Sequence, residues 1–281
     1  MNNNYNNGYN NGYPNNGYNG SYPNSGFSGY ENNGYNGGYT NLGYQNGGYG
    51  TQPYSSGATS MTVGDFARKV YAWMFLGLGI TFAIGIFLLI NAEMTAAFIV
   101  EHLEVYYILA LVEVALVFIL GFFVKSMPSS VCLVIFIAYS ALNGLTIAPS
   151  LIIFGAESAF MAFAATACIF GGMSIYGMLT KKDLSSLGTI LFFGLLGLIL
   201  FSCIAMFFNM PLNDLIISLV GIALFVGFTA YDTQKIKKYY NNLQFSDELL
   251  QRSAIIAALD LYLDFINLFL YILRLFARSR N

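Results

Sequence analysis

Residues 254–276 read AIIAALDLYLDFINLFLYILRLF, a long apolar run that contains acidic residues. Its polar side chains follow the spacing i, i+4, i+7 and i+11, at Asp260, Asp264, Asn267 and Tyr271. In an α-helix this spacing places them in one line, and Leu, Ile and Phe cover the remaining surface. A helix that is apolar on every other side is expected at the centre of a helix bundle, with its acidic line on a cavity.

The whole chain is too apolar for a soluble protein. Of its 281 residues, 56% are hydrophobic and 9% are charged, whereas a soluble domain has about 25% charged residues. Apolar runs long enough to cross a bilayer are predicted to be helices, because lipid offers no partner for open backbone groups. The predicted spans are 70–90, 106–124, 131–154, 159–179, 188–208, 215–231 and 254–276. We therefore predict an all-α integral membrane domain over residues 61–281, with the lipid bilayer as its surroundings.

Residues 1–60 have a different composition. They repeat a loose Gly-Tyr-Asn unit, lack Lys and Arg, and contain Glu31 as their single acidic residue. Such a segment buries too little apolar area to offset the entropy lost on ordering, so we predict a disordered tail. The simplest interpretation is a passive tail. Weak self-association or docking of a partner are alternatives, because spaced tyrosines among polar residues are typical of self-associating segments.

The basic residues predict the orientation in the membrane. Nine of the twelve Lys and Arg residues lie before the first predicted span or after the second, fourth and sixth. Because basic loops remain in the cytoplasm, the tail and these loops are expected there. No cleavable signal peptide is expected at the start of the chain. We expect a full crossing by the seventh segment, and a plasma membrane location, or the endoplasmic reticulum membrane in a eukaryote.

The remaining reactive side chains do not favour an enzyme. Cys132, Cys168 and Cys203 lie inside apolar runs without metal-ligand spacing, and we interpret them as helix-packing residues. His102 is the single histidine, expected in a solvated connecting loop. Phosphate-binding loops and Ser/His pairs are missing from the sequence, so neither catalysis nor a cofactor is expected. The net charge of −2 predicts no nucleic-acid partner.

Four carboxylates lie within or at the end of apolar runs, at Glu113, Asp232, Asp260 and Asp264. A charged carboxylate at the bilayer centre costs about 2.5–3.5 kcal/mol, so these side chains are expected to face an interior cavity or a partner. No basic residue is expected deep in a span to neutralise them, and carboxylates held in this way share protons. A proton-controlled element, a cation site, or both are predicted, and oxygen ligands suit hard cations such as Ca²⁺. For Asp260, a solvated position at the cytoplasmic interface is an equal alternative.

Several of these residues belong to motifs that resemble the Bax inhibitor family, also called the transmembrane Bax inhibitor motif family. The sixth predicted span ends in FTAYDTQ at residues 228–234, and the seventh contains LYLDFINLF at residues 261–269. The segments FARKVY at 66–71, NGLT at 143–146 and KKDLS at 181–185 also fit, so the resemblance covers residues 60–277. It implies six helices wrapped around a central C-terminal seventh helix.

The resemblance also implies a pH-sensitive calcium leak, opened and closed by a hydrogen-bonded aspartate pair. By motif the pair is Asp232 and Asp264, which would act as pH sensor and hold Ca²⁺ transiently. Glu113 matches an acidic position near the cation path, to which we assign Asp260 and Asn267 as well. Some members have an arginine after the second span that latches to the pair. Here the latch is absent or replaced by Lys125.

These residues leave several classes of function open. The leading hypothesis is a passive, proton-regulated pathway for cations, with Ca²⁺ as the favoured ion. The same acids could instead exchange H⁺ for Ca²⁺. A regulatory membrane protein that binds a membrane protease or a stress-response partner is a different class. Intramembrane aspartyl proteolysis is disfavoured because the Gly-x-Gly-Asp context is missing around Asp264. The oligomeric state, the ion and the direction of the pH effect stay open.

Overall fold

The computed structural model describes residues 61–123, 126–208 and 214–278. The predicted disordered tail and the proposed latch residue Lys125 both lie outside these residues. The described residues form eight α-helices and no strand, namely α1 (Val63–Ile90), α2 (Ala92–Glu101), α3 (Leu103–Phe123), α4 (Ser129–Phe154), α5 (Ala156–Leu179), α6 (Ser185–Phe207), α7 (Asp214–Leu243) and α8 (Asp247–Arg278). All except α2 are long and apolar enough to cross a membrane. The predicted all-α membrane fold is confirmed.

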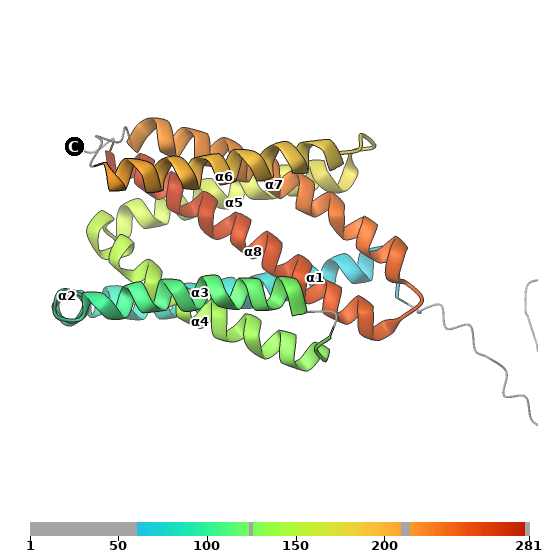
Figure 1. Ribbon diagram of the computed structural model, residues 1–281, viewed down its shortest axis with the longest axis horizontal. Helices are drawn as coiled ribbons and strands as arrows, with labels where there is room; N and C mark the ends of the chain where they lie inside the picture. Colours follow the sequence, from blue (N-terminus) through green and yellow to red (C-terminus); the bar gives the residue numbers. More distant parts are fainter. Residues whose placement is uncertain (1–60, 124–125, 209–213, 279–281) are drawn as a thin grey trace, which may run out of the picture. The chain divides into compact units, whose positions relative to one another are not determined.

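The C-terminal helix α8 lies at the centre of the bundle. In its most apolar stretch 67% of the residues are buried, compared with 6% in α3 and 11% in α6. It packs against α1, α4, α5 and α7, whereas α3 packs mainly on α4, and α6 on α7. Figure 1 shows α8 running obliquely between a group formed by α1, α3 and α4 and a group formed by α5, α6 and α7. The predicted central position of the last helix is therefore confirmed.

A short helix, α2, follows α1 where a connecting loop was expected. Its sequence AEMTAAFIVE is rich in helix-forming residues, and Asn91 ends α1 and begins α2. Thr95 Oγ1 donates a hydrogen bond of 3.0 Å to Leu88 O, which closes the bend between the two helices. His102 lies in the one-residue connection between α2 and α3, and 40% of its side chain is exposed, so the expected loop is present but far shorter.

Helix α7 is longer than the predicted sixth span, which ended at residue 231. The apolar run ends there, but the helix continues to Leu243 because its inward face stays buried. Thr233 and Ile236 are both fully buried, at helical spacing. The basic residues Lys235, Lys237 and Lys238, which had been assigned to a cytoplasmic loop, therefore lie on an amphipathic extension of α7.

Candidate functional site

The central carboxylates Asp232 and Asp264 lie at the interface of α7 and α8. They are 8% and 3% exposed, respectively. Asp264 Oδ2 is buried and has no hydrogen-bond partner among the described residues. The two residues interact electrostatically, but within the described part of the chain no hydrogen bond joins their carboxyl groups. The structure thus brings the pair to one interface without the shared hydrogen bond that the resemblance implies.

A lysine that follows the end of the predicted sixth span lies beside these acids and was not expected as their partner. Lys235 Nζ is 2.7 Å from Asp260 Oδ2 and 3.4 Å from Asp232 Oδ1. Its side chain is 29% exposed and lies over the ring of Tyr239, at 5.4 Å from the centroid. The contact arises because α7 continues past Asp232, which places Lys235 on the same face at i+3. That spacing was the signal in the sequence that could have identified it.

The resulting cluster contains more acid than base. Asp264 lies one helical turn after Asp260 on α8, and Lys235 contacts both Asp260 and Asp232 from α7. Asp260 is half-buried, with 24% of its side chain exposed, and forms an ion pair with Lys235. One ammonium group thus lies among three carboxylates. Groups of three or more His, Cys, Asp or Glu side chains suited to a metal ion are not found in the described ranges.

A second polar group surrounds Glu113 on α3. Glu113 Oε1 accepts a hydrogen bond of 2.8 Å from Thr146 Oγ1, and Oε2 accepts one of 3.5 Å from Asn143 Nδ2, both from α4. These residues line a cavity of about 300 Å³ to which Asn267 of α8 also contributes. Asn143 Oδ1 is buried and has no hydrogen-bond partner among the described residues. Glu113 and Asn267 therefore meet at one cavity, as a shared role would require.

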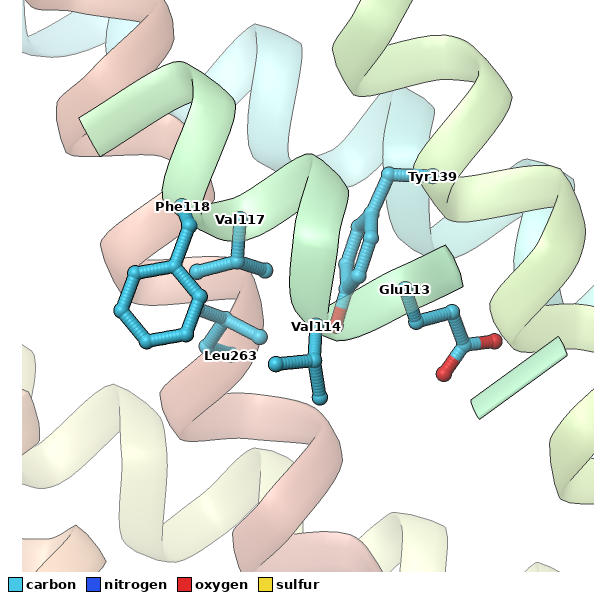
Figure 2. A pocket seen from close by; sticks show the side chains of 6 residues that line it. All are labelled: Glu113, Val114, Val117, Phe118, Tyr139 and Leu263. Atoms are coloured by element: carbon cyan, nitrogen blue, oxygen red, sulfur yellow. The ribbon is translucent and has the colours of Figure 1, made fainter. Parts of the chain in front are cut away.

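An apolar pocket of about 230 Å³ adjoins Glu113 on its other side. Figure 2 shows that the Glu113 carboxylate points away from Val117 and Phe118, which line this pocket. Tyr139 lines both the apolar pocket and the polar cavity. The carboxylate is thus directed to the side where Thr146 and Asn143 provide hydrogen bonds, and the apolar wall faces the other way.

The polar line of α8 is divided among different neighbours. Asp260 bonds to Lys235 of α7, and Asn267 lies at the cavity with α3 and α4. Tyr271 packs over Gly221 of α7 and stacks on Phe225, with ring centroids 6.0 Å apart. The expectation that the line faces a single cavity is therefore corrected. The cause is the oblique course of α8, which brings successive turns against different helices.

The extension of α7 also holds the loop between α5 and α6. Gln234 accepts a hydrogen bond of 2.8 Å from Leu184 N and donates one of 2.7 Å to Lys182 O. Lys238 Nζ lies 2.8 Å from Asp183 Oδ1. The hydrogen bonds from Lys238 and Ser185 lower the pKa of Asp183 to about 2. The KKDLS segment is thereby fixed to the helix that carries Asp232.

Comparison with known proteins gives a consistent result. The family model described as inhibitor of apoptosis-promoting Bax1 matches residues 63–281. The inner membrane protein YbhL of Escherichia coli K12 is 36% identical over 217 residues, covering 76% of this chain and 92% of that protein. An uncharacterized protein of Borreliella burgdorferi is 37% identical over 216 residues, covering 77% and 93%. Since the match includes all the candidate membrane spans and both groups of carboxylates, the chain belongs to the Bax inhibitor-1 family of multi-span membrane proteins.

Proposed function

We propose that the protein is a pH-sensitive leak pathway for cations, with Ca²⁺ as the principal ion, in a cell membrane with its N-terminus in the cytoplasm. The observation that carries the proposal is Asp264, a buried carboxyl group on the central helix whose Oδ2 has no hydrogen-bond partner among the described residues. A carboxylate at such a depth is costly to ionise without compensation. Its protonation state is therefore linked to the conformation around it.

In this proposal, Asp232 and Asp264 form the gate. A neutral Asp264 is compatible with close packing of α7 on α8. Loss of its proton adds repulsion from Asp232 and Asp260, and Lys235 is already bonded to these two residues. The repulsion favours either separation of the helices or entry of a cation, which shifts a closed–open equilibrium. We therefore expect the flux to rise with pH.

The cavity at Glu113 supplies a second position on the proposed path. Its oxygens come from a carboxylate, a hydroxyl and side-chain amides, which suit a hard cation such as Ca²⁺. Asn267 lies three residues after Asp264, a rise of about 4.5 Å along α8. The two proposed positions therefore lie within one helical turn of each other along α8, although they face different helices.

The test is Ca²⁺ flux into proteoliposomes between pH 5 and 8. We compare the wild type with Asp232→Asn and Asp264→Asn, and use Asp214→Asn as the matched control because Asp214 is exposed at the start of α7. The proposal predicts a pH-dependent flux that the first two substitutions flatten and the control retains. Equal flux at all pH values in every protein would contradict it.

The same assay separates a leak from H⁺/Ca²⁺ exchange, because both functions would use the same carboxylates. A pH gradient is imposed across vesicles that hold equal Ca²⁺ on the two sides. Valinomycin and K⁺ hold the membrane potential at zero. A leak then gives no net Ca²⁺ movement. Net Ca²⁺ accumulation under these conditions would show that the protein is an exchanger and not a leak.

A further inference from the structure

A large apolar groove lies between α1 and α5. Its volume is about 1000 Å³, and every side chain that lines it is apolar. Residues 75–90 of α1 and 156–167 of α5 form the walls, and Phe265 and Phe269 of α8 lie at its base. The volume is at the upper end of the range of about 300–1,000 Å³ found for small-molecule sites.

The groove is at least as long as one leaflet of a bilayer is thick. It begins where α1 ends and α5 starts, and reaches the middle of both helices. At 1.5 Å per residue, its walls extend over about 22 Å of α1 and about 16 Å of α5. One leaflet of the hydrocarbon core is about 15 Å thick. The groove is therefore long enough to take up an acyl chain from one leaflet.

The apolar lining of the groove determines which kind of ligand can bind there. A polar ligand would lose its hydrogen bonds to water without replacement, and an apolar cavity does not hold water. The rim continues into the bilayer-facing surface, where Phe75, Ile90 and Phe160 are 62%, 78% and 74% exposed. Lipid chains therefore reach the groove directly. We propose that it binds one acyl chain of a phospholipid from that leaflet.

The base of the groove is preformed. The Phe82 ring meets Phe163 and Phe269 edge to face, with centroids 5.0 and 5.3 Å apart. Phe163 also meets Phe265 at 5.7 Å. Packing of this kind holds the rings in fixed positions. Binding of an acyl chain therefore costs little free energy for ordering these side chains.

Two glycines provide a matched pair for the test. A Cβ atom at Gly79, in the groove, or at Gly197, on α6, would meet nothing within 4 Å. The substitution Gly79→Leu fills the groove, whereas Gly197→Leu adds the same side chain elsewhere. The full chain is purified in mild detergent and its bound phospholipid is counted by native mass spectrometry. We expect one phospholipid on the wild type and on Gly197→Leu, and at least fivefold less on Gly79→Leu.

A second measurement applies if Gly79→Leu does not fold. The chain has a single tryptophan, Trp73, which is replaced by Phe before a new tryptophan is introduced by Phe163→Trp in the groove or Phe192→Trp on α6. Both proteins are placed in bilayers that contain increasing fractions of phosphatidylcholine with brominated acyl chains. If a single lipid site adjoins the tryptophan, fluorescence quenching is proportional to that fraction. If several lipids adjoin it, the fluorescence falls more steeply at low fractions. Identical curves for the two proteins, or a wild type without retained phospholipid, would overturn the proposal.

Discussion

At the residue scale, Lys235 is the side chain on which the acidic cluster depends. We predict that Lys235→Met lowers the free energy of unfolding by about 1–3 kcal/mol, because two partly buried carboxylates lose their charged hydrogen-bond donor. The cost is below the 3–5 kcal/mol of a fully buried pair, since the side chains of Lys235 and Asp260 are 29% and 24% exposed. The measurement is unfolding in detergent micelles at pH 7.

The control for this prediction is Lys238→Met. Its partner Asp183 is 71% exposed, and exposed ion pairs contribute about 0–1 kcal/mol. A double-mutant cycle then combines Lys235→Met with Asp260→Asn. If the two substitutions add without coupling, the 2.7 Å contact between Lys235 and Asp260 contributes nothing to stability, and the description of the cluster as a lysine-bridged unit is wrong.

The sequence identifies the acids of the site better than their partners. Asp232, Asp264 and Glu113 stand out because a carboxylate in an apolar run is unusual. Lys235 was missed because basic residues near a span end also indicate a cytoplasmic loop. Only the continuation of α7 decides between the two interpretations, and that continuation depends on burial of Thr233 and Ile236 against other helices. The i+3 spacing of Lys235 from Asp232 indicates the contact only once the helix is known to continue, and tertiary packing decides that continuation.

At the scale of elements, the close crossing of α5 and α7 places the chain segment that carries Asp232. A Cβ atom added to Gly177 would overlap Ala230 O and lie 3.0 Å from Thr233 Cβ. We predict that Gly177→Ala destabilises the protein by about 1–3 kcal/mol, because the helix backbones must separate. The measurement is again unfolding in detergent, and the same variant should change Ca²⁺ flux because Asp232 moves with α7.

The matched control lies on the same helix. A Cβ atom at Gly172 meets nothing within 4 Å, so Gly172→Ala should leave stability unchanged or slightly raised. If both substitutions destabilise the protein equally, the destabilisation comes from lost flexibility of α5 and not from its close contact with α7. Recurrent glycines in apolar runs predict close helix packing, but the sequence alone does not distinguish Gly177 from Gly172.

Some helix boundaries could be predicted from the sequence and others could not. The lipid-facing stretches were predicted well because the bilayer requires long apolar helices. The ends of α1 and α7 were not, since α1 begins at Val63 and α7 ends at Leu243, outside the apolar runs. The start of α1 does have a local signal, because Thr62 and Asp65 form a capping box. The end of α7 is fixed by contacts with distant segments, including the loop that Gln234 binds.

At the scale of the whole molecule, the pH dependence of flux should come from the interior and not from the surface. The pKa of Asp183 is lowered to about 2, so the stabilisation from its ionised form is present above about pH 4 and is lost as the pH falls toward 2. Asp183 stays ionised between pH 5 and 8. We therefore predict that Asp183→Asn leaves the pH profile of Ca²⁺ flux unchanged. A shifted midpoint in this variant would place the sensor at the α5–α6 loop.

The last prediction concerns residues 1–60, which precede the region that the family model matches. The relatives from Escherichia coli and Borreliella burgdorferi align with 76% and 77% of the chain. If the membrane domain is a cation pathway, deletion of residues 2–60 should leave Ca²⁺ flux in proteoliposomes within about twofold, since every group assigned to the pathway lies between Glu113 and Asn267. In the deleted protein, Asp264→Asn should still flatten the pH profile. Loss of flux in a deleted protein that remains folded would make the tail part of the transport mechanism. Intact flux combined with loss of the cellular effect would instead favour a regulatory protein that binds its partner through the tail.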